Sequence, residues 1–264
     1  MRRLFCILLC LLLLTGCRGA DVSSESKPNT DYYPALIAHA GGAIAGFRYT
    51  NCREALDNSY ENGYRFFEVD IDLTSDGYPV LIHDWDSMAE RMLLSPGKRT
   101  REEFLSSKSF LNLTLMDLDG LCAWLGSHGD AVIVTDIKDN NYEILKTLAE
   151  GWPELLDRVI PQIYSYDEYD SIKGLGYNRI ILTLYRLNLD IEAVAAFAGE
   201  KKPWAITVAE SRLSEELLSA IREKDPQCGI YAHTVNSLAA FEKWEPLGLT
   251  GIYSDYFLPN FWIN

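Results

Sequence analysis

Short apolar runs alternate with longer segments of helical periodicity from residue 34 onward. The apolar runs have the length and the β-branched and aromatic content of buried strands. There are eight of them, at residues 35–40, 66–71, 131–137, 158–164, 179–185, 203–209, 228–234 and 251–256. Eight buried strands that alternate with helices predict a TIM-type (β/α)8 barrel, with a parallel sheet inside and helices outside.

The intervening segments predict helices at residues 52–62, 141–152, 166–176, 214–224 and 236–248. Asn140 or Asn141, Ser214 and Asn236 are the expected N-terminal caps of three of them. Residues 85–115 interrupt the pattern with a basic, polar segment that we interpret as a loop insertion. Residues 34–264 therefore form one predicted barrel domain, in which the closing helix after the last strand is largely absent.

The N-terminal segment has the pattern of a targeting signal rather than of a fold. Residues 4–14 are continuously apolar, which is too short for an ordinary membrane span, and small residues lead to Cys17. Residues 1–17 resemble a bacterial lipoprotein signal that ends in a lipidated Cys17, and 18–33 is polar and predicts a flexible tether. The alternative is a simple N-terminal anchor. The signal predicts an exported lipoprotein that is bound to the membrane of the cell envelope.

The amino-acid composition limits which kinds of molecule the protein can bind through its surface charge. The net charge of −14 excludes non-specific nucleic-acid binding and any general attraction to anionic lipid, so a lipid anchor would have to supply membrane attachment. Cys52, Cys122 and Cys228 lack the spacing of a zinc site or a disulfide framework. They predict buried thiols, with one disulfide allowed by an exported location.

Polar residues recur at the C-terminal ends of the predicted strands. Barrels of this type carry their active sites at that end, with residues contributed by several strands. The set comprises His39, Glu68, Asp70, Asp136, Lys138, Gln162, His233 and Asp255. We interpret this shared placement as the signature of an active site.

Glu68 and Asp70 alternate with apolar residues, so both lie on one face of a buried strand. A buried carboxylate needs a compensating charge. One interpretation is a divalent cation, Mg²⁺ or Ca²⁺, with Asp136 of the next strand as a third oxygen ligand. The other is a structural ion pair with Lys138. The spacing leaves both interpretations open.

The chain has four histidines, and two of them end apolar runs beside this acidic group. His39 and His83 are therefore candidates for proton transfer. His233 is expected to form a wall of the pocket, and His128 is interpreted as a loop residue without a role.

Six segments, in order, resemble the glycerophosphodiester phosphodiesterases, which are TIM barrels of the phospholipase C-like phosphodiesterase superfamily. They are "IAHAGG", "TNCREAL", "FEVDIDLTSDGYPVLIHD", "TDIK", "HTVN" and "GIYSDY". The resemblance runs from Ala35 to Tyr256, and the long central segment is the most specific. Within it, Asp72 is expected to lie past the metal and to help hold the turn at Asp76-Gly77.

The resemblance implies a role for each of these residues. Glu68 and Asp70 match metal ligands, and Asp136 stands where the family usually has a ligating Glu. His39 and His83 match the two catalytic histidines, with His39 expected as the base and His83 as the acid. The resemblance also places Lys138 near the phosphate.

Two positions depart from the family pattern. Ala40 replaces the Arg of the first motif, and Thr50 replaces a Glu, whereas Asn51 is retained. Arg48 and Lys138 are the expected substitutes for the phosphate-binding Arg. Gln162 and His233 complete the expected substrate contacts.

The implied activity is metal-dependent hydrolysis of a glycerophosphodiester to an alcohol and a phosphomonoester such as glycerol 3-phosphate. One alternative is a phospholipase C- or D-like enzyme that cleaves an intact lipid, for which Trp85, Met88 and Met92 would form an apolar lip. The other is a lipoprotein that binds a phosphorylated ligand without turnover.

Overall fold

Eight parallel strands form a closed ring in the computed structural model, which describes residues 33–87, 92 and 94–259. They are β1 (Leu36–Ala38), β2 (Phe66–Leu73), β4 (Val132–Asp136), β5 (Val159–Ile163), β6 (Ile181–Thr183), β7 (Ala205–Ala209), β8 (Gly229–His233) and β9 (Gly251–Ser254). The order β1-β9-β8-β7-β6-β5-β4-β2 closes because β1 also pairs with β2. Each predicted run coincides with one strand, so the predicted barrel is confirmed.

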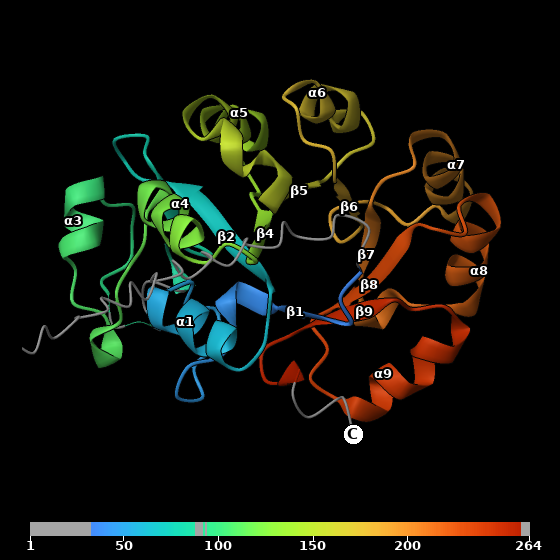
Figure 1. Cartoon of the computed structure of the whole chain (residues 1–264), viewed down its shortest axis with the longest axis horizontal. Coiled ribbons are helices and arrows are strands. Elements are labelled where there is room, and N and C mark those ends of the chain that lie inside the picture. Colours follow the sequence, from blue (N-terminus) through green and yellow to red (C-terminus); the bar gives the residue numbers. More distant parts are fainter. Residues whose placement is uncertain (1–32, 88–91, 93, 260–264) are drawn as a thin grey trace, which may run out of the picture.

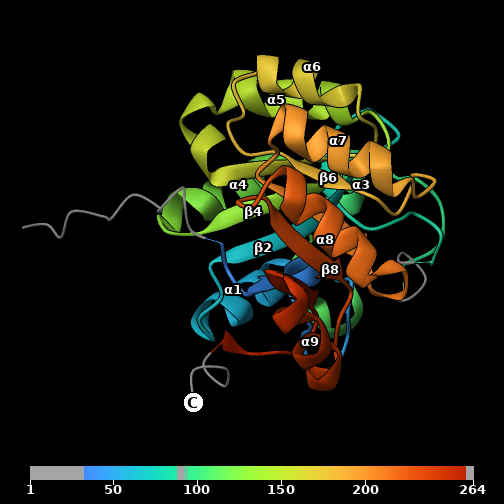
Figure 2. The ribbon, with the colours of Figure 1, turned by 90° about the vertical axis from the view of Figure 1, so that its right-hand side faces the viewer.

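Helices surround this ring, as Figures 1 and 2 show. They are α1 (Arg53–Glu61), α4 (Leu118–Ser127), α5 (Asn141–Gly151), α6 (Glu168–Gly174), α7 (Ile191–Lys201), α8 (Glu215–Lys224) and α9 (Leu238–Trp244). None of the helices in the described residues is long and apolar enough to cross a membrane. Cys52, Cys122 and Cys228 are buried and free, which confirms the prediction of buried thiols.

The five predicted helices are confirmed, but α4 and α7 were not predicted from the sequence. The α7 segment is rich in alanine, so its buried and exposed faces differ little in hydropathy. Ser214 caps α8 by accepting a hydrogen bond from the backbone of Leu217, as expected. Asn140 and Asn236 make no such cap. Asn236 instead binds Asp255 in the active site.

The predicted loop insertion is more ordered than expected. Just before it, residues 79–81 form β3 (Pro79–Leu81), which returns antiparallel to β2. Helix α3 (Arg101–Ser106) follows inside the insertion, and Thr100 and Glu103 form a reciprocal capping box at its start. The Thr-x-x-Glu spacing was the available signal for this helix.

The interior of the barrel changes from apolar to polar along the strand direction. Strand alternation directs one set of apolar side chains inward, where they form a separate core cluster. Its strand members are Ile37, Phe66, Val132, Val134, Ile160, Ile181, Ala205, Tyr231 and Tyr253. The next inward positions are Glu68 and Asp70 on β2 and Asp136 on β4. The apolar layer therefore supports an acidic layer directly above it.

The two ends of the described chain lie against the barrel. Tyr33 stacks on Trp204 at the start of β7, which is the end of the barrel opposite the acidic layer. No α-helix follows β9 in the described residues, which end at Pro259, in agreement with the predicted lack of a closing helix. Phe257 and Leu258 pack on the core instead.

Gly251 at the start of β9 sets how closely the ring can close. A Cβ atom at this position would lie 2.6 Å from the carbonyl oxygen of Ala35 and 2.8 Å from that of Pro34. Both atoms belong to the backbone, so they cannot rotate away. We expect Gly251→Ala to lower the free energy of unfolding by about 1–3 kcal/mol in urea denaturation.

Gly126 in α4 is the matched control, because a Cβ atom there meets nothing within 4 Å. Gly126→Ala is expected to raise stability by about 0.5–1 kcal/mol, through the higher helix propensity of alanine. Equal effects of the two substitutions would contradict a steric limit at Gly251.

Candidate active site

Three carboxylates meet where β2 and β4 run side by side. Asp70 and Asp136 are partners in the strand register, and Glu68 lies two residues before Asp70. One oxygen atom of each carboxylate lies within 4.8 Å of the other two, which makes the group able to hold a metal ion. Glu68 and Asp70 are each only 2% exposed. The predicted ligand set is therefore assembled in one place.

Backbone and side-chain donors orient two of these acids. The backbone N–H of Ala40 donates to Glu68 Oε2 over 2.7 Å. Asn51 holds Asp70 at two points. Its Nδ2 donates to Asp70 Oδ2 over 3.0 Å, and its Oδ1 accepts from the Asp70 backbone over 2.9 Å. Asn51 was not assigned a role from the sequence, although its retention in the "TNCREAL" motif was a signal.

Asp136 is held by two tyrosines. The hydroxyl groups of Tyr164 and Tyr185 both donate to its Oδ1, the latter over 3.1 Å. Neither tyrosine was predicted as a site residue. Burial and the charge of Asp70 raise the pKa of Asp136. These two donors help to keep a carboxylate in this position.

Lys138 lies against the same group. Its Nζ is 2.9 Å from Asp70 Oδ1 and 3.5 Å from Asp136 Oδ2. Burial would lower the pKa of Lys138, but the charges of the two aspartates raise it, so the ammonium stays charged. The predicted ion pair is therefore present. One ammonium cannot balance three carboxylates, so it does not exclude a metal.

The negative charge that Lys138 does not balance affects the pKa values of the acids. Burial and the charge of Asp70 raise the pKa of Glu68 to about 8. Burial also opposes ionisation of Asp70, but Lys138 and the nearby histidines hold the pKa of Asp70 below its usual value. In the protein alone, Asp70 is ionised and Glu68 holds a proton at neutral pH. An added cation would favour ionisation of Glu68.

His39 directly follows β1 and is oriented by an aspartate. Its Nδ1 lies 2.8 Å from Asp255 Oδ1, and its Nε2 lies 3.3 Å from Thr234 Oγ1. Asn236 fixes Asp255 in turn, because its Nδ2 donates to Asp255 Oδ2 over 2.7 Å. Burial alone would lower the pKa of His39. The hydrogen bond to Asp255 and the neighbouring acids, Glu68 first, outweigh burial and raise the pKa to about 9.

His83 has the same type of partner. Its Nδ1 lies 2.8 Å from Asp84 Oδ2, and Asp84 also accepts hydrogen bonds from the backbone and hydroxyl of Ser87. In both histidines Nδ1 is thus engaged by an aspartate. Nε2 is then the nitrogen available for proton transfer, and in His39 it lies next to the Thr234 hydroxyl. Asp255 was noted only as a strand-end residue, and Asp84 only as a neighbour of His83. Their orienting contacts required the structure.

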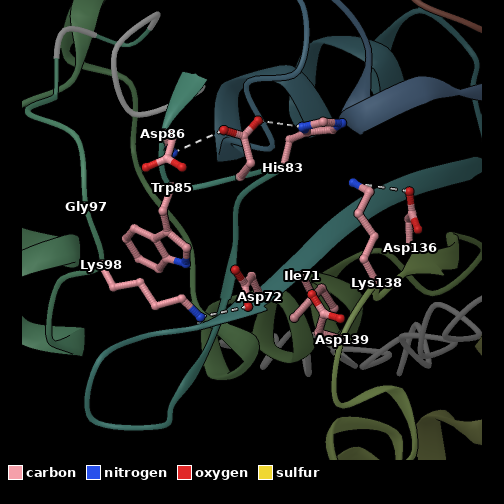
Figure 3. Close-up of a pocket in the computed structure, with 11 residues that line it drawn as sticks. Ile71, Asp72, His83, Trp85, Asp86, Gly97, Lys98, Asp136, Lys138 and Asp139 are labelled. Carbon is pink, nitrogen blue, oxygen red and sulfur yellow. Dashed lines mark hydrogen bonds and ion pairs between the residues drawn. The ribbon is translucent and has the colours of Figure 1, made fainter.

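A cavity of about 430 Å³ opens beside His83. Figure 3 shows Asp136 and Lys138 on one side of it and Asp72, Trp85 and Lys98 on the other. His39 lies outside this cavity, in a smaller one that extends into the barrel. His39 and His83 thus line different cavities, and Asp136 lines both of them.

The other predicted substrate contacts are also near the site. Gln162 and His233 line the smaller cavity together with His39 and Glu68. Arg48 lies at the rim, with Nη1 3.7 Å from Asp255 Oδ2 and 48% of its side chain exposed. Cys17, the predicted lipidation site, lies outside the described residues.

Asp72 does not hold the turn, contrary to expectation. It pairs with Lys98, with 3.3 Å between Oδ1 and Nζ. The turn is held by Thr74, whose Oγ1 donates to Asp76 over 2.5 Å and accepts from the Tyr78 backbone over 2.8 Å. Asp72 lies on the same face of β2 as Glu68 and Asp70, two residues beyond Asp70, and lines the larger cavity.

Comparison with known proteins identifies the family. The sequence profile of the glycerophosphoryl diester phosphodiesterase family matches residues 43–226, which is more than half of the chain. The chain belongs to this family. It is therefore a phosphoric diester hydrolase of the glycerophosphodiester phosphodiesterase type.

Solved structures support the barrel fold of this phosphodiesterase. A glycerophosphodiester phosphodiesterase from Thermotoga maritima is 20% identical, with a TM-score of 0.66, over 85% of this chain and 95% of the other. A glycerophosphoryl diester phosphodiesterase from Parabacteroides distasonis is 20% identical, with a TM-score of 0.68, over 85% and 84%. An Oleispira antarctica phosphodiesterase in complex with the product sn-glycerol-3-phosphate is 18% identical, with a TM-score of 0.68, over 84% and 93%.

His233 should make the stability of the phosphodiesterase sensitive to acid. Burial, with some repulsion from His39 and Arg212, lowers the pKa of His233 to about 4, whereas an unfolded histidine has a pKa of about 6.5. As the pH falls through this window the unfolded chain takes up the proton first, so the folded state loses stability. Relative to His233→Gln, we expect the wild type to lose about 1–2 kcal/mol of unfolding free energy between pH 7 and 4.5.

Urea denaturation followed by tryptophan fluorescence at several pH values measures this difference. The His128→Gln variant controls for the loss of a histidine outside the barrel interior. Parallel stability profiles for the wild type and His233→Gln would contradict a buried, neutral imidazole at position 233.

Proposed function

We propose that the protein hydrolyses a glycerophosphodiester to an alcohol and a phosphomonoester such as glycerol 3-phosphate. The observation that carries the proposal is a pair of imidazoles, each with Nδ1 engaged by an aspartate, beside one group of buried carboxylates. This arrangement suits general acid–base catalysis on a phosphate bound beside the acidic group, within reach of both His39 and His83. The family membership and the product held by the Oleispira antarctica enzyme support the same reaction.

The two histidines divide the proton transfers. We assign His39 as the base that accepts the proton of the attacking hydroxyl at Nε2, and His83 as the acid that protonates the leaving alcohol. His39 is protonated at neutral pH in the protein alone, because the nearby acids raise its pKa to about 9. Positive charge bound among Glu68, Asp70 and Asp136 removes part of this cause and lowers that pKa toward the working range of a base.

The donor set fits a divalent cation, and we propose Mg²⁺ or Ca²⁺ held by Glu68, Asp70 and Asp136. All three donors are carboxylate oxygens, which these cations prefer, and no cysteine lies among them. When bound, the cation supplies positive charge that stabilises the developing charge on the phosphoryl oxygens. The protonated state of Glu68 also indicates that one more positive charge is needed here.

Two side chains are proposed to bind the phosphate in place of the Arg that Ala40 replaces. Lys138 lies among the acids, and Arg48 lies at the rim beside Asp255. The exposed guanidinium of Arg48 can offer two parallel donors to a phosphate, whereas Lys138 acts as a point charge. Gln162 and His233 are proposed to contact the half of the substrate nearer His39.

A soluble diester is favoured over an intact lipid. The apolar lip expected for a phospholipase is not formed by Trp85 and Met92, which are only 5% exposed and belong to the core beneath the insertion. Met88 lies outside the described residues. Tyr33, where the described chain begins, packs at the end of the barrel opposite the acidic group. An anchor attached there leaves the mouth of the barrel free to face solvent.

We retain export as a lipoprotein as a proposal. It rests on the signal-like residues 1–17 and on the polar segment that follows Cys17. The acidic net charge of −14 would not draw the protein to anionic lipid, so acylation of Cys17 would be the attachment. Globomycin-sensitive processing and mass spectrometry of the mature N-terminus test this proposal.

Hydrolysis of a panel of phosphodiesters with Mg²⁺ or Ca²⁺ tests the activity directly. We expect release of glycerol 3-phosphate from at least one glycerophosphodiester, and a fall in kcat of about 10²–10⁴-fold in His39→Gln, because proton transfer is lost. His128→Gln is the control and should retain full activity.

Two outcomes would contradict this scheme. Undiminished turnover by His39→Gln would remove His39 from the chemistry. A wild-type protein that binds phosphodiesters but cleaves none of them would instead support the ligand-binding lipoprotein.

Metal binding should depend on pH through Glu68. Because the pKa of Glu68 is raised to about 8 and a ligand must be ionised, we expect cation affinity to rise about tenfold per unit between pH 6 and 8, then to level off. Calorimetric titration in buffers of different ionisation enthalpy should show release of a proton at pH 7.

Glu68→Gln should abolish both the tight binding and its pH dependence. Asp72→Asn is the matched control, since this acid lies on the same strand but pairs with Lys98, and its affinity should stay within about threefold. Tight binding by Glu68→Gln would show that the ion sits elsewhere.

A further inference from the structure

Tyr49 lies between the two proposed catalytic histidines. Its ring centroid is 4.7 Å from that of His39, with an angle of 80° between the planes. On the other side it is 5.0 Å from the ring of His83, with an angle of 70°. Both are edge-on aromatic contacts. One side chain therefore contacts both imidazoles, although His39 and His83 are far apart in the sequence.

The backbone at Tyr49 adopts an unusual conformation to place this ring. Its φ angle is 60°, in the left-handed region that is rare for a bulky residue. Ala40 and Asn51, in the same connection between β1 and α1, also have positive φ angles of 48° and 49°. Such conformations persist where the surrounding structure enforces them, and they gather at functional sites.

Neighbouring contacts enforce the conformation. Asn51, two residues after Tyr49, is bound to the backbone and side chain of Asp70. Ala40, which follows His39, donates its backbone N–H to Glu68. The segment that carries Tyr49 is thus tied at both ends to the acidic group. The Tyr49 ring is therefore held in place relative to the carboxylates beside which the two histidines lie.

The aspartate partners alone leave each imidazole one degree of freedom. A hydrogen bond at Nδ1 fixes one atom of the ring, but the ring can still tilt about that bond and move Nε2. A side chain packed against the ring removes this tilt. Tyr49 does so for His39, which is paired with Asp255, and for His83, which is paired with Asp84.

We propose that Tyr49 is a positioning residue whose aromatic ring sets the orientation and spacing of the His39 and His83 imidazoles relative to the reacting phosphate. The ring, rather than the hydroxyl, makes the two contacts. A displacement of about 1 Å at a reacting group can reduce the rate about 10²-fold, so a spacer between two proton-transfer groups acts on kcat. The kinetic part of this proposal rests on the proposed phosphodiesterase function.

Three substitutions in the full chain separate the ring from the hydroxyl and the backbone. Tyr49→Phe keeps the ring and should retain kcat within about threefold. Tyr49→Leu removes the ring and should lower kcat about 10–100-fold, with KM changed by less than about threefold. Tyr49→Gly relieves the positive φ angle as well as removing the ring, so it should fold at least as stably as Tyr49→Leu and be as slow.

Tyr60 provides a matched control. It makes the same type of contact with His128, at 4.4 Å and 75°, between α1 and the end of α4. Tyr60→Leu therefore also removes an edge-on tyrosine from a histidine, but outside the site. Its kcat should match the wild type after correction for the folded fraction.

The resonances of the four histidine rings provide a readout that does not depend on turnover. Removal of an aromatic ring at 4.7–5.0 Å changes the ring-current shifts of its neighbours. Tyr49→Leu should shift the ring protons of His39 and His83 and leave those of His128 in place. Tyr60→Leu should shift those of His128 and leave the other two.

Three results would each overturn the proposal and leave the proposed function intact. They are a wild-type kcat in Tyr49→Leu, a kcat in Tyr49→Phe as low as in Tyr49→Leu, and unchanged His39 and His83 resonances in Tyr49→Leu. A wild-type protein that is inactive on the whole panel of diesters overturns the proposed function instead. In that case the resonances alone decide whether the Tyr49 ring holds the two imidazoles.

Discussion

The burial of three carboxylates at one end of the barrel is the constraint on which the site depends. Glu68, Asp70 and Asp136 lie on two adjacent parallel strands, directly above an apolar layer. Glu68 and Asp70 are almost fully buried and Asp136 is partly buried, so water screens their charges poorly and the protein must supply donors and positive charge. Lys138 supplies one charge, and the proton on Glu68 marks the position of the charge that is still lacking. A divalent cation meets this requirement with the oxygen ligands that it prefers.

The residues around the acids meet the same need for hydrogen-bond donors and positive charge. Asn51, Tyr164 and Tyr185 donate hydrogen bonds to side chains that would otherwise repel one another. The electric field of the acids also acts on His39, which would be neutral at this depth if burial alone decided its state. Metal binding and proton transfer are thus coupled through charge as well as position. Asp255 takes part in this coupling, because its hydrogen bond to His39 also raises the pKa of that histidine.

The departures at Ala40 and Thr50 have a structural consequence. Ala40 offers no guanidinium, and only its backbone N–H serves the site, by binding Glu68. Thr50 is 3% exposed and its Oγ1 accepts a hydrogen bond from the thiol of Cys52, so it points into the core rather than toward the acids. Arg48 and Tyr49 lie between these two positions in the sequence. Arg48 lies at the rim beside Asp255, and Tyr49 packs against both histidines. Arg48 and Tyr49 thus bring a cation and an aromatic ring to the site.

The sequence alone determined the barrel, the acidic strand end and the two histidines. Alternation on β2 places Glu68 and Asp70 on one face whatever the tertiary structure, and parallel strands necessarily bring their C-terminal ends together. Tertiary structure decided which partners these residues have, because hydrogen bonds between distant segments leave no periodic signal. Asn236 reads locally as a helix cap but binds Asp255, and Trp85 reads as an exposed lip but is buried under the insertion. Tyr49 is the clearest case, since only folding brings one ring between two histidines that lie 44 residues apart along the chain.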